Sequence, residues 1–209
     1  MSTKLKIAAA VAAAVLLSAC SSPKHEPMPL VKFTPSMEVT EVWSKGLSSA
    51  EGFLVPAVYD DMVFAAGGKT LTRLNARTGE TEWSVSFNSP ITGGVGSDGY
   101  VTAVGLWDGN LEVVDAEGKV SWEKKLTTEL ASPPVVSHGL VIARTMDTRV
   151  SAFEASSGEL QWTYQRSQPA LTVRLPTRML AHDNFLLVGQ PNGCLLYTSP
   201  SPRDAHESR

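Results

Sequence analysis

Leu74-Asn-Ala-Arg-Thr-Gly-Glu-Thr-Glu-Trp83 is a stretch of sequence that recurs twice further along the chain. The related stretches are Val114-Asp-Ala-Glu-Gly-Lys-Val-Ser-Trp122 and Phe153-Glu-Ala-Ser-Ser-Gly-Glu-Leu-Gln-Trp162, each with a glycine four residues before its tryptophan. Trp43 precedes them, and the step from each tryptophan to the next is nearly constant. A fixed period, here about 40 residues, is the sequence signature of a repeat protein.

Between successive tryptophans the chain reads as short apolar and β-branched runs separated by turn residues, with no helical period. In one repeat we predict strands at 83–87, 91–95, 100–106 and 111–115, with turns at 97–99 and 107–110. Asp-Gly between apolar runs is a strong hairpin signal. Four antiparallel strands in about 40 residues make up a propeller blade. The sequence therefore predicts an all-β fold, a partial β-propeller of about four blades.

The recurring glycines and tryptophans are predicted to hold the blades together. Glycine permits the positive φ angle that a tight turn can require, and an indole on the strand that follows can bury a large apolar surface between neighbouring blades. These structural residues are Trp43, Trp83, Trp122, Trp162, Gly79, Gly118 and Gly158. Trp107 lies outside the spacing, and we place it in a loop, either as an incidental surface aromatic or as a binding residue.

The N-terminal residues have the pattern of a bacterial lipoprotein signal. Lys4 and Lys6 precede an apolar run from Ile7 to Leu17, which is shorter than the ~20 residues of a membrane-spanning helix, so residues 1–19 are predicted to be a signal peptide. Leu17-Ser-Ala-Cys20 resembles a lipobox, which implies that Cys20 is lipidated. Acyl chains on Cys20 would anchor the protein stably. Residues 20–37 are then a lipid-anchored flexible tether. The alternative is an ordinary signal peptide with an incidental cysteine.

The C-terminal residues 194–209 do not continue the repeat. The stretch from Cys194 to Arg209 resembles the in-frame translation of a transposase-end sequencing adapter. Pro202 stands where the spacing predicts the next tryptophan. We therefore expect the natural sequence to end near Gly193 and the partial propeller to cover residues 38–193, with residues 194–209 an artefact.

The alanine, glycine and tryptophan of each repeat resemble those of the pyrroloquinoline-quinone-type propellers over about residues 38–193. Propellers of that superfamily usually have eight blades, so the resemblance implies about half of a ring. The superfamily contains quinoprotein dehydrogenases and also a non-enzymatic branch, the BamB family of outer-membrane lipoproteins. Together with the lipobox at Cys20, the repeats resemble the BamB branch.

Pro169-Ala-Leu-Thr-Val-Arg174 resembles a Pro-x-Leu-x-Leu-Arg loop of the BamB family, in which the loop contacts BamA, the barrel-forming subunit. The resemblance implies partner-binding roles for Leu171, Val173 and Arg174, although valine replaces a leucine and Leu175 stands in place of a glycine. Apolar anchors beside an arginine suit an interface. Alternation alone equally allows a strand with Leu171, Val173 and Leu175 facing the core. Five arginines late in the chain are interpreted as a solvated face: Arg144, Arg149, Arg166, Arg174 and Arg178.

Composition excludes several classes of function. The net charge of −3 argues against nucleic-acid binding. The only cysteines are Cys20 and Cys194, so no disulfide, thiolate metal site or cysteine nucleophile is predicted. His25, His138 and His182 are far apart, and the last two are placed in equivalent exposed turns. Metalloprotease, phosphate-loop and serine-hydrolase motifs are missing from the sequence.

The resemblance implies a non-enzymatic scaffold, lipid-anchored at the periplasmic face of the outer membrane, that aids the assembly of outer-membrane β-barrel proteins. Its implied partners are a BamA-like barrel-forming protein, other subunits of the assembly machinery and outer-membrane protein clients, with no cofactor. One alternative is a membrane-anchored quinoprotein dehydrogenase, which would need a carboxylate base and calcium ligands around the quinone. Another is a periplasmic sensor or a generic interaction propeller.

Overall fold

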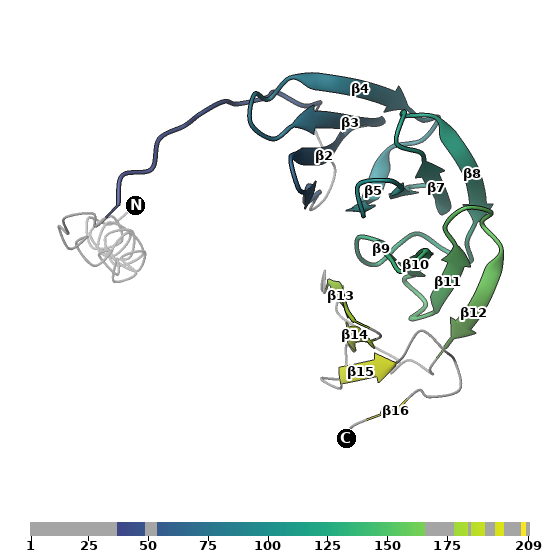
Figure 1. Ribbon diagram of the computed structural model, residues 1–209. Helices are drawn as coiled ribbons and strands as arrows, with labels where there is room; N and C mark the ends of the chain where they lie inside the picture. The colour runs from purple at the N-terminus through teal and green to yellow at the C-terminus, as the bar shows by residue number, and fades with distance from the viewer. Residues whose placement is uncertain are drawn as a thin grey trace, which may run out of the picture. The chain divides into compact units, whose positions relative to one another are not determined.

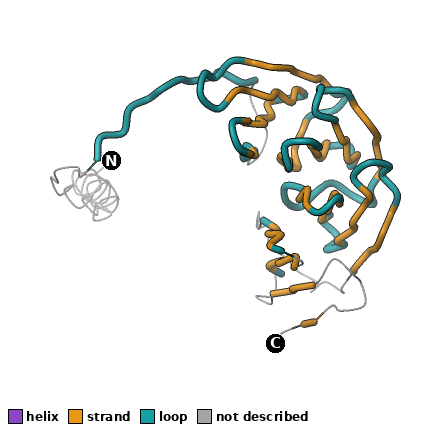
Figure 2. Tube along the Cα trace, viewed as in Figure 1, coloured by secondary structure: helices purple, strands orange, loops and turns teal. Residues whose placement is uncertain are grey.

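A computed structural model describes residues 37–48, 54–165, 178–183, 185–190, 195–198 and 206–207 of the chain. The chain divides into two compact units, Met1–Thr40 and Glu41–Arg209, and every strand lies in the second unit. Residues 37–40, the described part of the first unit, contain neither strand nor helix. Figure 2 shows strands and loops, and no helix, in the described part of the chain.

The strands form four sheets of four antiparallel strands each, and within every sheet the strands pair in chain order. Figure 1 shows the sheets following one another along the second unit. The first sheet contains β1 (Ala57–Tyr59), β2 (Met62–Gly67), β3 (Thr70–Asn75) and β4 (Thr81–Ser86); the second contains β5 (Ile91–Ser97), β6 (Thr102–Leu106), β7 (Asn110–Val114) and β8 (Val120–Lys125). The third contains β9 (Val135–Ser137), β10 (Leu140–Arg144), β11 (Val150–Glu154) and β12 (Leu160–Tyr164); the fourth contains β13 (Met179–His182), β14 (Phe185–Gly189), β15 (Leu195–Thr198) and β16 (His206–Glu207).

A turn that contains a residue with positive φ connects the first two strands of each sheet. Asp60, His138 and Asp183 occupy these turns with φ angles of 48°, 52° and 48°, and Gly99 occupies the corresponding turn of the second sheet with a φ of 89°. Asparagine, aspartate and histidine are the non-glycine residues that adopt this left-handed conformation most readily. The prediction of four short strands in a repeat is confirmed, although β5 extends to Ser97 and β6 begins at Thr102 rather than at residue 100.

Apolar side chains fill the space between consecutive sheets. Phe64 and Leu71 of the first sheet pack with Val104 and Val114 of the second. A second cluster joins the second and third sheets, and a third cluster joins the third and fourth. The two middle sheets therefore bury both faces, so their inner strands, such as β6 and β11, carry buried residues at consecutive positions rather than in strict alternation.

The repeating tryptophans dock each sheet onto the next one. The indole Nε1 of Trp43 donates to the carbonyl of Ala76 at 2.9 Å, Nε1 of Trp83 donates to Ala116 at 2.9 Å, and Nε1 of Trp122 donates to Ala155 at 2.8 Å. Every one of these bonds spans 33 residues. Trp83 and Trp122 thus reach from the last strand of one sheet to the last turn of the following sheet, and Trp43 reaches the last turn of the first sheet from the segment that precedes it.

The glycines of these turns have a second role that the sequence did not reveal. Gly79, Gly118 and Gly158 have φ angles of 73°, 84° and 70°, as expected. A Cβ atom on Gly118 would also lie only 2.8 Å from Cδ2 of Trp83, and the same relation holds for Gly79 with Trp43 and Gly158 with Trp122. The prediction associated each glycine with the tryptophan four residues later; in the structure the glycine lies against the indole of the preceding repeat.

Trp162 is the exception to this docking pattern. Its side chain is buried, with 9% of its surface exposed, but its Nε1 has no hydrogen-bond partner among the described residues. At the spacing of the other three bonds, its acceptor would belong to Leu195, the first residue of β15. Strands β15 and β16 lie in the stretch 194–209 that the sequence predicts to be foreign, and that assignment remains a prediction.

Substituting Gly118 with alanine tests the close approach of the indole. We expect Gly118→Ala to lower the free energy of unfolding by about 2–4 kcal/mol, because the left-handed turn is strained and the indole of Trp83 must move. Gly139→Ala is the matched control: Gly139 has a φ of 73° but nothing within 4 Å of an added Cβ, so its cost should be about 1 kcal/mol. Urea denaturation measures both; equal losses would contradict the docking role.

Comparing two tryptophans tests the indole hydrogen bond. Trp122→Phe removes the indole donor to the carbonyl of Ala155 and should cost about 1–2 kcal/mol more than Trp162→Phe. The change at Trp162 removes a buried N–H that has no described acceptor. Both changes remove a similar apolar area, so the difference between the two unfolding free energies isolates the hydrogen bond. A larger loss at Trp162 would show that its Nε1 is in fact satisfied.

Candidate functional site

The predicted partner-binding residues belong to the connection between β12 and β13. Leu171, Val173 and Arg174 lie outside the described residues, as does the lipidation residue Cys20. Because β12 is the last strand of the third sheet and β13 the first strand of the fourth, the connection leaves one sheet at Gln165 and enters the next at Arg178. The choice between a loop and a strand at 171–175 therefore remains open.

A polar network holds the start of this connection. Nη2 of Arg149 donates to Oε1 of Gln165 at 2.8 Å, and Nε of Arg149 lies 3.7 Å from Oδ2 of Asp147. Asp147 also accepts hydrogen bonds from the hydroxyls of Thr127, at 3.0 Å, and of Thr145. The turn between β10 and β11 is thereby joined to the end of β12, which fixes where the connection leaves the third sheet.

The pKa of Asp147 reflects this network. Partial burial alone would raise the pKa, but the hydrogen bonds from Thr145, Thr127 and the backbone of Arg149, with the charge of Arg149, together hold it below its ordinary value of 3.8. Asp147 is therefore ionised at neutral pH and its bonds to the neighbouring turn are charge-assisted.

Arg144 does not belong to a solvated face, so the interpretation of the late arginines as one exposed group is wrong for this residue. Its side chain is 4% exposed, and its Nη1 donates to the carbonyl of Gly189 in the fourth sheet at 2.8 Å. Burial lowers the pKa of the guanidinium. Arg144 thus joins the third and fourth sheets, whereas Arg178 is exposed at the entrance to β13.

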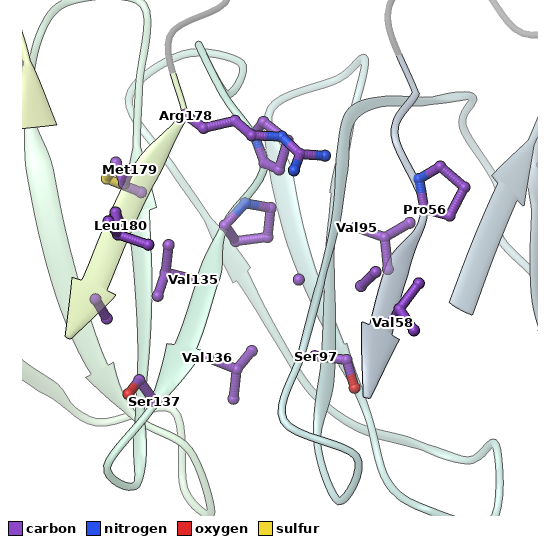
Figure 3. Close-up of a pocket in the computed structure, with 15 residues that line it drawn as sticks. Pro56, Val58, Val95, Ser97, Val135, Val136, Ser137, Arg178, Met179 and Leu180 are labelled. Carbon is purple, nitrogen blue, oxygen red and sulfur yellow. The ribbon is translucent and has the colours of Figure 1, made fainter. Parts of the chain in front are cut away.

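The first strands of the four sheets border a groove of about 480 Å³. Figure 3 shows Pro56 and Val58 before and on β1, Val95 and Ser97 on β5, and Val135 to Ser137 on β9 along its walls. Arg178, Met179 and Leu180 complete the lining, with Arg178 at one end of the groove. Arg178 is also the last residue of the β12–β13 connection, so this end of the connection lies at the groove.

Trp107 lies in the turn between β6 and β7, as predicted, and 58% of its surface is exposed. The turn is well supported: the amide of Trp107 donates to the carbonyl of Pro90 at 2.8 Å, and the amide of Leu126 donates to Gly109 at 3.0 Å. A fixed, exposed tryptophan is compatible with both readings of this residue, a surface aromatic or a binding residue.

Chemistry-bearing side chains are dispersed over the described strands and turns. No three His, Cys, Asp or Glu side chains of the described residues gather closely enough to hold a metal ion. His138 and His182 are both exposed, as predicted, but only His138 lies in its turn. His182 is the last residue of β13, and Asp183 holds the position equivalent to His138. Within the described part, no helix is long and apolar enough to cross a membrane.

The protein is a partial β-propeller of four blades. Each blade is a four-stranded antiparallel meander. Neighbouring blades stack through apolar clusters, and each cluster includes a tryptophan of the repeat. The family model described as outer membrane protein assembly factor BamB matches residues 67–202. The chain belongs to the BamB family.

Named relatives agree with this family. The outer membrane protein assembly factor BamB of Burkholderia pseudomallei is 37% identical over 194 residues, covering 90% of this chain and 51% of the relative. That of Bordetella pertussis is 33% identical over 187 residues, covering 86% of this chain and 48% of the relative. The chain therefore spans about half the length of the curated relatives it matches.

Solved structures give the same fold. The crystal structure of BamB from Moraxella catarrhalis superimposes with a TM-score of 0.63 at 26% identity, over 70% of this chain and 45% of that chain. The computationally designed Ika8 protein superimposes with a TM-score of 0.57 at 15% identity, over 69% of this chain and 44% of that chain, and shows the propeller fold alone.

Removing the charge of Asp147 tests the network at the connection. We expect Asp147→Asn to lower the free energy of unfolding by about 1–2 kcal/mol at pH 7, because charge-assisted hydrogen bonds are lost. A carboxyl whose pKa is depressed in the folded state stabilises the fold above its unfolded value of 3.8 and loses this contribution as pH falls through the folded pKa. The difference between variant and wild type should therefore shrink at pH 3.

The control for this comparison is Asp61→Asn. Asp61 forms an ion pair with Arg77 at 3.1 Å, but both side chains are well exposed, and exposed pairs contribute only about 0–1 kcal/mol. Urea denaturation at pH 7 and pH 3 provides the measurement. A loss at Asp147 that is no larger than the loss at Asp61 would show that the network does not hold the connection.

Proposed function

We propose that the protein is a non-enzymatic scaffold of the β-barrel assembly machinery that aids assembly and insertion of outer-membrane β-barrel proteins. Membership of the BamB family carries this proposal, because the matched relatives are named as outer membrane protein assembly factors. The partners are a BamA-like barrel-forming protein, other subunits of the machinery and outer-membrane protein clients. The same names support a role that involves no chemistry of its own and no cofactor.

The contact with the barrel-forming partner is proposed to run through the connection between β12 and β13. Leu171 and Val173 supply apolar anchors, and Arg174 supplies a planar fork of donors that suits carboxylates or carbonyls on the partner. The geometry of the flanks supports this choice. Gln165 is bound by Arg149 at one end, and Arg178 borders the groove at the other, so the segment begins at a hydrogen-bonded residue and ends beside the groove.

The scaffold is proposed to sit at the periplasmic face of the outer membrane, attached through acyl chains on Cys20. A signal peptide at 1–19, a tether at 20–37 and a propeller beginning at residue 38 give this organisation. A flexible tether of this length reaches on the order of 20–25 Å on average. The tether thus lets the propeller engage a partner beside its anchor without fixing its orientation.

Co-purification tests the partner-binding segment. The protein, expressed with its signal peptide and in its full natural length, is purified from detergent-solubilised membranes, and the recovery of the barrel-forming partner is quantified. Leu171→Ala with Arg174→Ala should reduce recovery at least about tenfold, since hot-spot residues typically contribute about 2 kcal/mol or more.

The matched control carries Leu160→Ala with Arg77→Ala. Leu160 is 53% exposed on the outer strand β12, and the Arg77 side chain is 77% exposed, so the same two chemical changes are made away from the connection. Normal recovery is expected for the control. Unchanged recovery for the Leu171 and Arg174 variant would remove this segment from the proposed interface.

A further inference from the structure

One pair of positions differs between otherwise equivalent sheets. In the last two strands of a sheet, two residues face each other one step before the tryptophan pair. In the first sheet they are Thr72 and Ser84, with hydroxyl oxygens 3.1 Å apart, and in the third sheet they are Ser151 and Thr163, with hydroxyl oxygens 2.9 Å apart. In the second sheet the same positions hold Glu112 and Glu123, which are register partners on β7 and β8.

Two carboxyl groups at these positions are less easily accommodated than two hydroxyl groups, because a carboxyl group can be charged. Glu112 is only 8% exposed, and it lies on the same side of β7 as Val114, which packs in the cluster between the first and second sheets. Directly opposed residues on neighbouring strands have Cβ atoms about 5 Å apart, and like charges there are destabilising. A buried ionised carboxylate is costly as well. Because Glu112 is buried and its register partner Glu123 is exposed, the arrangement favours a proton on Glu112.

The charges around the pair do not offset this repulsion. Burial, the charge of Glu123, a hydrogen bond with Glu123 and the charge of Asp108 together raise the pKa of Glu112 to about 7. The first sheet contributes the apolar side chains Phe87 and Val85 on this side. It also contributes Arg73, whose guanidinium forms an ion pair with Glu82 and donates to the carbonyl of Ala116. Two nearby lysines bind backbone oxygens: Nζ of Lys125 donates to the carbonyl of Asp108, and Nζ of Lys69 donates to that of Asn88 at 2.8 Å. Lys124 projects from the other face of β8, opposite Leu111.

We propose that Glu112 and Glu123 form a proton-sharing pair that makes the second sheet, and its docking onto the third, sensitive to pH in the neutral range. In the protonated form Glu112 donates to the Glu123 carboxylate. Release of this proton to solvent leaves two opposed carboxylates beside Asp108. Strand β8 then loosens, and β8 also carries Trp122, whose indole binds Ala155 of the third sheet. This device is independent of the proposed partner and would operate in the isolated protein.

The sign of the effect follows from proton binding. A carboxyl whose pKa is raised from 4.5 to about 7 in the folded state holds more protons when folded than when unfolded between these values. The folded state is therefore favoured at low pH and loses this advantage as pH rises toward and through 7. The unfolding equilibrium constant should rise by more than about tenfold from pH 5.5 to pH 8.

Grafting the hydroxyl pair of the sister sheets tests the proposal. In the double variant Glu112→Thr with Glu123→Ser, the unfolding equilibrium constant should rise less than about threefold between pH 5.5 and pH 8. Glu112→Gln keeps a hydrogen-bond donor, the side-chain amide, toward Glu123 but does not titrate. This single variant replaces the double variant in the test if the double variant fails to fold. The matched control is Glu117→Gln, on the exposed turn before Trp122, which should retain the full rise. The same rise in wild type and in Glu112→Gln would overturn the proposal.

Direct titration provides a second readout. The carboxyl ¹³C shift of Glu112, followed by NMR, should show a midpoint near neutral pH, and Glu123→Gln should lower it. Amide hydrogen exchange in β8 should increase from pH 6 to pH 8 by more than the intrinsic rate in wild type, but not in Glu112→Gln. A Glu112 midpoint below pH 5 would refute proton sharing whatever the stability data show.

Discussion

The docking of an indole onto a glycine turn in the following sheet is the interaction on which the rest of the structure depends. It combines a hydrogen bond of 2.8–2.9 Å with a backbone so close that no Cβ fits between them. Glycine in the turn meets both requirements, because it adopts the positive φ angle of the turn and has no Cβ atom to block the indole. The apolar clusters between sheets supply most of the buried area, but the indole fixes the position of one sheet against the next.

Much of this fold was predictable from sequence, and the reason lies in its repetition. The tryptophan spacing determines the length of a repeat, and the turn residues Asp60, His138, Asp183 and Gly99 divide each repeat into strands. The partner of each indole was not predictable in the same way. Gly118 stands four residues before Trp122, which suggests a local relation, whereas its contact is with Trp83. A contact between residues so far apart along the chain leaves no mark in a single sequence.

Buried charge was the other feature that sequence reasoning missed. Arg144 and Glu112 look like ordinary surface residues on strands, since charged side chains are seldom buried without a partner. The acceptor of Arg144 is a backbone carbonyl of the next sheet, which has no sequence signal. For Glu112 a signal did exist, because aligning the repeats sets a carboxyl pair against two hydroxyl pairs. Leu171, Val173 and Arg174 remain predictions that rest on a motif, although the residues at both ends of their connection, Gln165 and Arg178, are described.

The long separation in sequence between an indole and its acceptor has a consequence for the order of folding. As the chain is made from its N-terminus, the outer strand of a sheet forms before the turn that will hold its tryptophan exists. The indole of each sheet can therefore form its hydrogen bond only after about one further repeat has been made. Docking of the sheets then proceeds along the chain one repeat behind synthesis. Loops of this size close quickly, so the delay is short, but a chain that stalls within it exposes one unprotected strand edge at a time rather than several.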